Sequence, residues 1–388
     1  MKILYITTIS DTINAFLIPH IKLLIEQGNE VGIACNILEE IHPDLLEMGC
    51  KIHLIPFQRS PLKRENFKAY RRINLVISKE KYELIHVHTP IASILTRFAC
   101  RKLKGIKVIY TAHGFHFYKG APLFNWLVYY TAEKYIAKWT DTIITMNDED
   151  FDSAKTFNIR KKASLYKING IGLDLKRFQP LTSNLKTKIR KEYNFKEKDF
   201  LLIYVGEMCF RKNQDMLIQV MKLVNNSIPD IKLLLVGDGK KMDQYKDMTK
   251  KLNLNNCVKF LGYRQDVNKL MSLADVVVST SRQEGLPVNL MEGMATGLPL
   301  IVTNSRGNRD LVMNNNNGYV VELDEIDEFA DKIIKLYYSP EIRKKFGDKN
   351  LKIIKQYSLD AVLKELREIY ALHGVKDNGK NNDLKTMV

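Results

Sequence analysis

At 388 residues the chain exceeds what one hydrophobic core usually serves, so we expect two domains. A composition of 45% hydrophobic and 27% charged residues excludes a disordered or fibrous protein, and no segment reaches the roughly 18 uncharged apolar residues of a membrane span. The formal charge of +16 is uneven: residues 51–119 hold 15 Lys and Arg against 3 Asp and Glu, so this stretch is expected either to lie well solvated or to face a negative partner such as anionic lipid, nucleic acid or a phosphorylated substrate.

Short apolar runs alternate with longer amphipathic runs, which is typical of parallel sheets covered by helices. In the first half we predict strands near 2–7, 30–35, 51–55, 84–87, 107–111 and 141–145. Helices are predicted there near 16–27, 62–79, 91–103, 122–138 and 148–157. In the second half, strands are predicted near 201–205, 231–236, 257–261, 275–279 and 299–303. The two sets predict an α/β protein with two Rossmann-like, doubly wound domains that face a central cleft.

The domain limits follow from breaks in this pattern. Residues 179–200 contain Pro180 and a run rich in Lys, Asn and Thr without a sustained strand, so we interpret them as the linker between domains at 1–180 and 181–357. The periodic segment 358–373 predicts a last helix, which we expect to cross back to the first domain. The polar tail 374–388 is expected to be flexible.

The start of the chain and the cysteines bear on the compartment. Residues Met1–Thr7 are too short and too soon polar for a secretory signal, which predicts a cytoplasmic protein. The five cysteines form no C-x-x-C pair, which argues against a disulfide framework or a thiolate zinc site. We expect them to be small buried side chains; they are Cys35, Cys50, Cys100, Cys209 and Cys257.

The most informative stretch is 279–299, where an apolar strand runs into a loop with Gly and Pro and a helix begins near Val288. Free backbone amides at such a helix start, together with the helix dipole, suit a bound phosphate or sugar oxygen. Glu284 and Glu292, eight residues apart, are expected to flank that site from the loop and from the second helical turn. A solvated charged helix start is the alternative interpretation.

The sequence E-G-L-P-V-N-L-M-E from Glu284 to Glu292, followed by A-T-G-L-P, resembles the E-x7-E signature of glycosyltransferase family 4, whose members are retaining enzymes with the GT-B fold. The resemblance implies that Glu284 contacts hydroxyls of the transferred sugar and that Glu292 holds the nucleotide ribose. It also implies backbone contacts to the sugar and the diphosphate from Gly285, Leu286, Pro287 and Val288.

A second match is the segment Y-V-G-E-M-C-F-R-K-N-Q, residues 204–214. The family commonly shows G-R-x4-K-G here, and its Arg and Lys clamp the diphosphate. Lys212 occupies the Lys position, but Glu207, after Gly206, replaces the Arg. We expect donor contacts at Gly206 and Glu207 and take Arg211 as the candidate second cation, because it is adjacent and its guanidinium can fork onto phosphate oxygens. An exposed surface position is the alternative for both Lys212 and Arg211.

In the first domain, T-A-H-G-F-H follows an apolar strand. His113 matches a family histidine that touches the transferred sugar and is not expected to act as a general base. A histidine hydrogen-bonded between strand ends is the alternative. On the acceptor side, we predict contacts by His116 and by Thr8 and Asn14 of an opening loop, 7–14, which lacks the Gly-Gly pair of many relatives.

Two weaker segments resemble further family motifs. They are V-G-D-G at 236–239 and F-L-G-Y-R at 260–264, the second of which places Arg264 near the nucleobase. Either segment alone would be an ordinary turn after a strand. The stretch N-G-I-G-L-D-L-K-R-F, residues 169–178, resembles the family segment that leads into the linker, and we interpret it as interdomain structure.

No metal site is predicted. His86, His88, His113 and His116 invite comparison with a zinc cluster, but no carboxylate or cysteine at ligand spacing supports one. The run Asp148-Glu149-Asp150 has the D-x-D form that a different sugar-transferase fold uses with a metal. It sits where a helix begins, so a capping role is favoured.

The resemblance implies transfer of a hexose or N-acetylhexosamine from a nucleotide sugar, often UDP-linked, with retention and with no metal or other cofactor. The segments T-A-H-G-F-H-F-Y-K-G and G-E-x4-K-N-Q resemble capsular and exopolysaccharide enzymes, whose acceptors are typically undecaprenyl-diphosphate saccharides. The basic zone 51–119, with its amphipathic segment 62–79, would suit a peripheral enzyme on the anionic inner face of the cell membrane.

Two alternatives remain open at this point. A UDP-sugar 2-epimerase shares the architecture, and it would form an isomerised UDP-sugar without an acceptor. A basic nucleic-acid-binding protein is the other class, although the chain shows no basic-aromatic motif of a known module and we expect no nucleic-acid partner.

Overall fold

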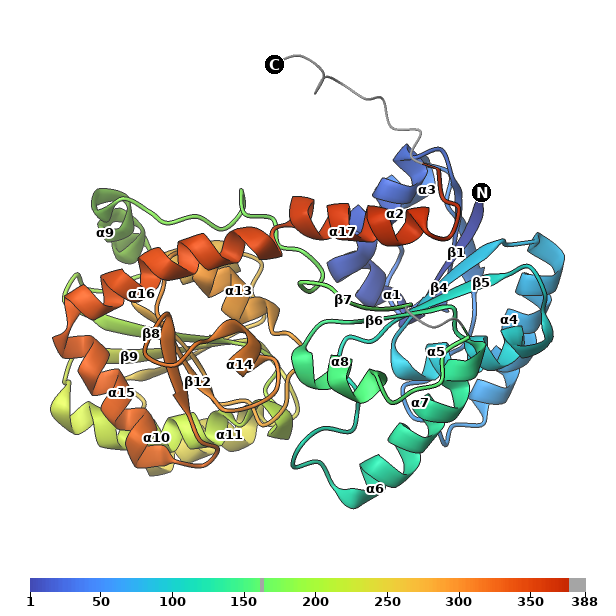
Figure 1. Cartoon of the computed structure of the whole chain (residues 1–388). Helices are drawn as coiled ribbons and strands as arrows, with labels where there is room; N and C mark the ends of the chain where they lie inside the picture. The colour runs from blue at the N-terminus through green and yellow to red at the C-terminus, as the bar shows by residue number, and fades with distance from the viewer. Residues whose placement is uncertain (161–163, 377–388) are drawn as a thin grey trace, which may run out of the picture. The chain divides into compact units, whose positions relative to one another are not determined.

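A computed structural model of the chain describes residues 1–160 and 164–376. The chain forms two compact units, the first from Met1–Ile171 with the chain from Val362 on, the second from Gly172–Ala361. Each unit holds one parallel sheet with helices packed against it, which confirms the prediction of two Rossmann-like domains (Figure 1). The predicted flexible tail lies outside the described residues from residue 377 on.

The sheet of the first unit has the order β3-β2-β1-β4-β5-β6-β7, and all its strand pairs are parallel. Its strands are β1 (Lys2–Ile9), β2 (Glu30–Asn36), β3 (Lys51–Leu54), β4 (Leu84–His88), β5 (Lys107–Thr111), β6 (Thr142–Thr145) and β7 (Leu165–Lys167). The six predicted strands are all present. The seventh, β7, has only three residues and therefore shows no periodicity in the sequence.

The helices of the first unit cover both faces of this sheet, as a doubly wound topology requires. They are α1 (Ser10–Thr12), η1 (Ile13–Leu17), α2 (Ile18–Glu26), α3 (Pro43–Glu47), α4 (Glu65–Glu80), α5 (Pro90–Ala99), η2 (Cys100–Lys102), α6 (Leu123–Asn125), η3 (Trp126–Tyr130), α7 (Thr131–Ile136), η4 (Ala137–Trp139) and α8 (Asp148–Ala154).

The predicted opening loop at 7–14 is wrong. Strand β1 continues to Ile9, and a helix starts directly at Ser10, where α1, η1 and α2 follow one another without a break. The predicted helix at 16–27 therefore begins earlier than expected. The hydroxyl of Ser10 accepts hydrogen bonds from the amides of Leu38 and Glu39, so this side chain provides an acceptor for two backbone amides of a neighbouring loop.

The sheet of the second unit has the order β10-β9-β8-β11-β12-β13 and is also parallel. Its strands are β8 (Phe200–Val205), β9 (Ile231–Val236), β10 (Val258–Gly262), β11 (Val276–Ser279), β12 (Leu300–Thr303) and β13 (Gly318–Val321). The five predicted strands are confirmed, and β13 is an additional edge strand of four residues.

The helices of the second unit pack on both faces of that sheet. They are α9 (Ser183–Glu192), η5 (Phe210–Lys212), α10 (Gln214–Ser227), α11 (Met242–Lys251), α12 (Val267–Leu273), α13 (Val288–Ala295), α14 (Asn308–Leu311), α15 (Ile326–Tyr338), α16 (Pro340–Ile353) and η6 (Ile354–Tyr357). Among the described residues, no helix has the length and apolar character that crossing a bilayer requires.

The predicted linker at 179–200 lies wholly within the second unit. Its middle forms α9, whose Arg190 is buried and donates hydrogen bonds to the carbonyl of Leu273 and to Asp275, at 2.6 Å from Oδ2. The pattern of Lys, Asn and Thr hides this helix because ion pairs and backbone acceptors hold it in place together with Ile189, which packs on the core.

The boundary between the units falls at Ile171–Gly172 rather than at 180–181. Leu173 and Phe178 are buried in the core of the second unit, which draws this segment into it. At the other end, the last helix α17 (Leu359–Ala371) belongs to the first unit from Val362 on. Its Tyr370 hydroxyl lies 2.6 Å from Nδ1 of His86 on β4.

Candidate active site

The loop after β8 carries the first cation of the second unit. The 3₁₀ turn η5 ends at Lys212, whose carbonyl accepts a hydrogen bond of 2.7 Å from the buried hydroxyl of Tyr204. The same hydroxyl lies 2.6 Å from Oγ of Ser281, at the end of the neighbouring strand β11. Gly206 leaves room for the lysine, because a Cβ there would lie 3.3 Å from Cε of Lys212.

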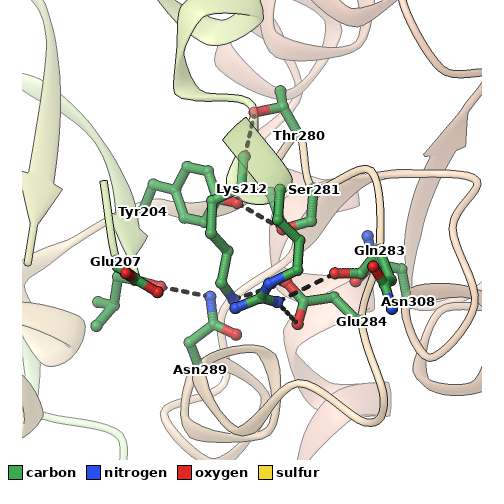
Figure 2. A network of polar contacts seen from close by, with 12 residues as sticks. Tyr204, Glu207, Lys212, Thr280, Ser281, Gln283, Glu284, Asn289 and Asn308 are labelled. Atoms are coloured by element: carbon green, nitrogen blue, oxygen red, sulfur yellow. Dashed lines mark hydrogen bonds and ion pairs between the residues drawn. The ribbon is translucent and has the colours of Figure 1, made fainter. Parts of the chain in front are cut away.

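The side chain of Lys212 points at Glu284, as Figure 2 shows, with 2.6 Å between Nζ and Oε1. Arg211 also reaches this carboxylate, with Nη1 at 3.2 Å from Oε2. Lys212 and Glu284 are buried, whereas Arg211 is partly exposed. The sequence-predicted cations and the first Glu of the signature are therefore in contact, with two positive charges around one carboxylate.

Glu284 is held in its charged form. Burial raises the pKa of its carboxyl, but the charges of Lys212 and Arg211 outweigh burial and leave the pKa below its usual value. Its backbone carbonyl accepts a hydrogen bond of 2.9 Å from Nε of the buried Arg306. The excess of positive charge at this point suits an additional anion, because an anion would share the cations that now face Glu284.

The loop from Gly285 to Pro287 is packed tightly against Gly307, before α14. Gly307 has φ of +78°, and a Cβ on it would lie 2.3 Å from the carbonyl oxygen of Gly285 and 3.2 Å from Cδ of Pro287. Only glycine combines this backbone conformation with so close an approach. The position of the loop backbone is therefore fixed by a neighbour that the sequence motif does not include.

Helix α13 begins at Val288, as predicted, and its first turn is anchored to the sheet. Asn289 donates a hydrogen bond of 2.8 Å from Nδ2 to the carbonyl of Val205 on β8. Leu286 and Val288 pack at the edge of the core of the second unit. The amides at the start of this helix therefore lie beside the end of β8, where Gly206 begins the loop that carries Lys212.

Glu292 lies on the second turn of α13 and differs from Glu284 in its electrostatics. Burial raises the pKa of its carboxyl to about 7, and the charge of Arg177 offsets only part of that effect. A carboxyl with a pKa near neutrality exchanges its proton at physiological pH. A raised pKa of this kind is what burial without an ion-pair partner produces in a carboxyl.

The V-G-D-G segment packs its glycines onto the 206–208 loop. A Cβ on Gly237 would lie 2.1 Å from the carbonyl oxygen of Gly206, and one on Gly239 would lie 2.5 Å from that of Met208. Both have positive φ, at +137° and +154°. These glycines are therefore required for close backbone packing beneath the cation loop, which is more than an ordinary turn would need.

Two predicted donor contacts have other surroundings. Arg264 is exposed and pairs with Asp266, with Nη2 at 2.6 Å from Oδ2, and Asp266 also accepts from the Tyr193 hydroxyl. Glu207 is exposed, and its carbonyl accepts from Nε2 of Gln214 at 2.8 Å. Glu207 therefore presents no cation where the family has its Arg.

The first unit holds a group of histidines on β4 and just after the end of β5. Nδ1 of His88 lies 3.0 Å from Nε2 of His113, so these two rings share a hydrogen bond. Burial, assisted by His20, lowers the pKa of His113 to about 4, which leaves the ring neutral at pH 7. His86 is hydrogen-bonded to Thr111 at 2.8 Å. The alternative of a histidine bonded between strand ends therefore describes the local contacts of His113.

A cavity of about 320 Å³ in the first unit gathers two of the three predicted acceptor-side residues. Thr8 and His116 line it, whereas Asn14 does not, because its side chain bonds Glu40 and His42 of a neighbouring loop. The remaining lining residues are Ile9, Thr12, Arg59, Pro61, Thr89, Pro90, Ile91 and Tyr129.

Thr89 gives this cavity a strained wall. It has φ of +65°, which is costly for a β-branched residue, and its hydroxyl lies 2.7 Å from that of Thr8. Backbone strain of this kind clusters at functional sites.

The structure also bears on the possible metal sites. In the parts of the chain that the structure describes, no three His, Cys, Asp or Glu side chains are grouped to hold a metal ion. The D-x-D run forms the first turn of α8, where Asn147 accepts from the amide of Asp150 and caps the helix. Asp150 accepts in turn from the amide of Phe115 at 3.1 Å. The predicted helix start is confirmed, but the capping role belongs to Asn147 and not to the acidic run.

Sequence reasoning missed several site residues. Arg306, Gly307 and Asn289 position the Glu284 loop and α13, and Thr89 shapes the cavity. Asn289 lies inside the E-x7-E motif, and this position is the sequence feature from which a role at the site could have been predicted. The other three act through tertiary contacts with segments distant in sequence. All five cysteines are free, and the predicted burial is confirmed for all but Cys209.

Comparison with known proteins identifies the family. Residues 2–147 match a family described as Glycosyl transferase 4-like, and residues 186–352 match Glycosyl transferases group 1. The chain is 37% identical over 374 residues to EpsD of Bacillus subtilis (strain 168), covering 96% of this chain and 97% of EpsD. The chain belongs to the group 1, family-4-like glycosyltransferases.

Another relative of this glycosyltransferase is an Escherichia coli enzyme named UDP-Gal:alpha-D-GlcNAc-diphosphoundecaprenol alpha-1,3-galactosyltransferase. It is 31% identical over 364 residues, which cover 90% of each chain. Among solved structures, HepE of Anabaena in complex with UDP-glucose superposes with a TM-score of 0.75 at 18% identity, over 96% of this chain and 100% of HepE. That likeness confirms the GT-B fold of the glycosyltransferase.

Proposed function

We propose that this glycosyltransferase moves a hexose or N-acetylhexosamine, with retention of configuration, from a UDP-sugar to a saccharide carried on undecaprenyl diphosphate. The observation that carries the donor half is the pair of cations, Lys212 and Arg211, beside the helix start at Val288. Such an arrangement suits a diphosphate. The E. coli relative supports the lipid-linked acceptor, and the complex of HepE with UDP-glucose supports the nucleotide.

In the proposed reaction the bond between the anomeric carbon of the sugar and the diphosphate oxygen breaks, and a hydroxyl oxygen of the acceptor bonds to that carbon. The proton of this hydroxyl passes to the leaving diphosphate, which gains negative charge as its bond to the sugar breaks. Lys212, Arg211 and the amides at the start of α13 stabilise that charge, which is electrostatic preorganisation. Glu284 holds the sugar hydroxyls, and Glu292 holds the ribose. The role of a divalent ion is thereby taken by side chains, and we propose that no metal is required.

The acceptor is placed in the cavity of the first unit that Thr8 and His116 line. A lipid-linked acceptor places the enzyme at the inner face of the cell membrane, in the synthesis of a capsule, exopolysaccharide or related surface glycan. His113 contributes a neutral imidazole, since its pKa of about 4 leaves it uncharged at physiological pH. This agrees with a sugar-contacting role and not with that of a general base at pH 7.

The test is a donor screen with the purified protein. UDP-linked glucose, galactose and their N-acetyl forms, with GDP- and ADP-sugars for comparison, are incubated with and without an undecaprenyl-diphosphate saccharide, and products are analysed by mass spectrometry and NMR. We expect acceptor-dependent transfer from one UDP-sugar and an anomeric configuration that matches the donor. An isomerised UDP-sugar formed without acceptor would instead support the 2-epimerase. Binding to RNA or DNA without any nucleotide-sugar binding would contradict both the transferase function and the epimerase function.

A further inference from the structure

Over its first two turns, the helix that starts at Leu123 carries apolar or aromatic side chains at every position except Asn125, which donates a hydrogen bond to the carbonyl of His116. Trp126, Tyr129 and Tyr130 pack against the core of the first unit. On the other side, Leu123 is 81% exposed, Phe124 64% and Leu127 72%. Large apolar side chains that are exposed together on one face of a helix mark an interaction site, so this outward face indicates a missing partner.

A second apolar segment adjoins this helix. Leu62, before α4, is 92% exposed, and Phe67 in its first turn is 60% exposed. Arg59 and Pro61 of the same segment line the cavity together with Tyr129 of η3, so the two segments meet at the cavity rim. We define the docking surface as the exposed apolar residues of both segments, which are Leu62, Phe67, Leu123, Phe124, Leu127 and Val128.

The charges around the docking surface are almost all positive. Glu65 is the one acidic residue from Arg59 to Arg72, and no acidic residue lies between Glu83 and Glu133. Glu133 is buried and paired with Arg97 at 2.6 Å, so it contributes no negative charge to the surface. The basic residues of the first stretch are Arg59, Lys63, Arg64, Lys68, Arg71 and Arg72.

Cations and exposed rings are combined in one layer, because α4 packs on α5 and α5 on α7. The guanidinium of Arg71 lies 4.7 Å from the ring centre of Phe67, and that of Arg101 lies 3.9 Å from Phe98. The ammonium of Lys138 lies 3.5 Å from the ring centre of Tyr135. Rings and long basic side chains of this kind suit the boundary between lipid headgroups and acyl chains.

We propose that the docking surface inserts into an anionic lipid bilayer, with the basic residues on the headgroups and the apolar residues in the acyl boundary. This rests on the proposed function, because a lipid-linked acceptor must reach the cavity from a membrane. A second copy of the chain would bring like charges together on this face. A nucleic acid would leave the aliphatic side chains of Leu62, Leu123 and Leu127 unused.

The proposal places the cavity mouth at the membrane surface. Thr8, Thr89 and Arg59 line the cavity, and the docking surface begins at its rim. A diphosphate headgroup can therefore enter the cavity while its lipid chain stays in the bilayer. Membrane binding by the docking surface has an apolar contribution, which persists at high salt, and an electrostatic contribution, which salt weakens. This distinguishes the docking surface from a purely basic zone.

The test is sedimentation of the full chain with vesicles of phosphatidylglycerol and phosphatidylcholine, compared with vesicles of phosphatidylcholine alone. We expect binding to the anionic vesicles that weakens with salt without vanishing. The pair L123S and L127S should weaken it about tenfold at high salt, and the pair K68Q and R71Q should weaken it at low salt. The matched controls are L46S with L185S, which are exposed leucines of α3 and α9, and K188Q with K191Q of α9.

Three outcomes overturn the proposal. One is unchanged vesicle binding by L123S/L127S. A second is a concentration-dependent dimer that this pair abolishes, and a third is salt-sensitive RNA binding without vesicle binding. Transfer to an acceptor in detergent micelles separates this proposal from the proposed function. The variants should keep that activity, and a wild type that binds vesicles without any transfer contradicts the function alone.

Discussion

Lys212 and Glu284 form a buried ion pair, with 2.6 Å between Nζ and Oε1, across 72 residues of sequence. Each comes from a loop that follows a strand of the same sheet, and β8 and β11 are neighbours in it. The pair therefore stands at the carboxyl edge of a parallel sheet, where open α/β sheets bind ligands. A donor diphosphate would take over part of the interaction that Lys212 makes with Glu284.

Lys212→Ala tests the charge-stabilising role. Because the lysine faces charge that grows in the transition state, we expect kcat to fall on the order of a hundredfold. Donor affinity should fall as well. Steady-state kinetics give the result, with circular dichroism and melting curves as the control for folding, since breaking a buried pair is destabilising. Wild-type turnover in a folded variant would show that Lys212 is no phosphate clamp.

Arg211→Ala tests whether Arg211 is the second cation of the phosphate clamp. Its guanidinium contacts Glu284 and the carbonyl of Gln283, and the family Arg is replaced by the exposed Glu207. We expect a loss of kcat that resembles that of Lys212→Ala but is smaller, because Arg211 is partly exposed and its charge is screened. Glu207→Ala serves as the comparison and should change kcat little. Near-normal kinetics of Arg211→Ala would leave Lys212 and the backbone amides as the whole clamp.

Glu292 gives the donor KM a dependence on pH. Its pKa of about 7 means that it is protonated below neutrality and charged above, and the charged carboxylate is the better acceptor for ribose hydroxyls. We expect the donor KM to fall as pH rises through about 7, with kcat little changed. Glu292→Gln should raise the KM and remove this step. An identical pH profile in both proteins would contradict the assignment.

The same raised pKa affects stability. The folded protein holds the Glu292 proton up to about pH 7, whereas the unfolded chain releases it near the ordinary pKa of about 4.3. The unfolded state therefore binds fewer protons between these values, and the free energy of unfolding falls as pH rises through that window. Glu292→Gln lacks this loss, so its stability relative to wild type should increase from pH 4.5 to 7. Denaturant unfolding at several pH values measures it.

Independence from divalent metal follows from the proposed use of Lys212 and Arg211 as the phosphate clamp. We expect transfer to continue at the same rate after exhaustive treatment with EDTA. Turnover is compared before and after chelation, and again after adding magnesium or manganese. Complete loss that either ion restores would contradict the prediction and would call for carboxylates that hold a metal with the diphosphate.

The sequence predicts the fold where periodicity is long enough to be seen. The predicted strands are present, whereas β7, of three residues, is too short for a pattern, and β13 directly follows the Asn run 314–317, which is typical of a loop. Helix α9 was missed because ion pairs hold its polar residues, as Arg190 and Asp275 show. The start of α1 at Ser10 was missed because this serine bonds another loop rather than capping its own helix.

For the site, the motif residues were predictable and their supports were not. Lys212, Arg211 and Glu284 meet as expected, because motif spacing after a strand fixes which edge of the sheet they occupy. Arg306 and Gly307 support the same loop from a later segment, and nothing local in their sequence indicates this contact. Asn14 was predicted as an acceptor contact because it is a polar residue near the end of a strand. Its side chain instead donates a hydrogen bond to the carbonyl of Glu40 in a neighbouring loop.

Gly307→Ala tests whether the position of the 285–287 backbone matters for catalysis. The new Cβ would lie 2.3 Å from the carbonyl oxygen of Gly285, so the loop must shift, and misplacement by about 1 Å can cost on the order of a hundredfold in rate. We expect kcat/KM for the donor to fall by that order.

The matched control for this substitution is Gly105→Ala. Gly105 has φ of +85°, close to the +78° of Gly307, but a Cβ there meets no atom within 4 Å. Both variants carry the backbone strain of a left-handed residue, about 1 to 2 kcal/mol. Gly105→Ala should therefore be less stable than wild type but keep the wild-type kcat/KM for the donor. Gly307→Ala should be lower in both stability and kcat/KM. Equal kinetics of the two variants, each shown to be folded, would mean that the loop tolerates displacement and that its backbone does not contact the donor.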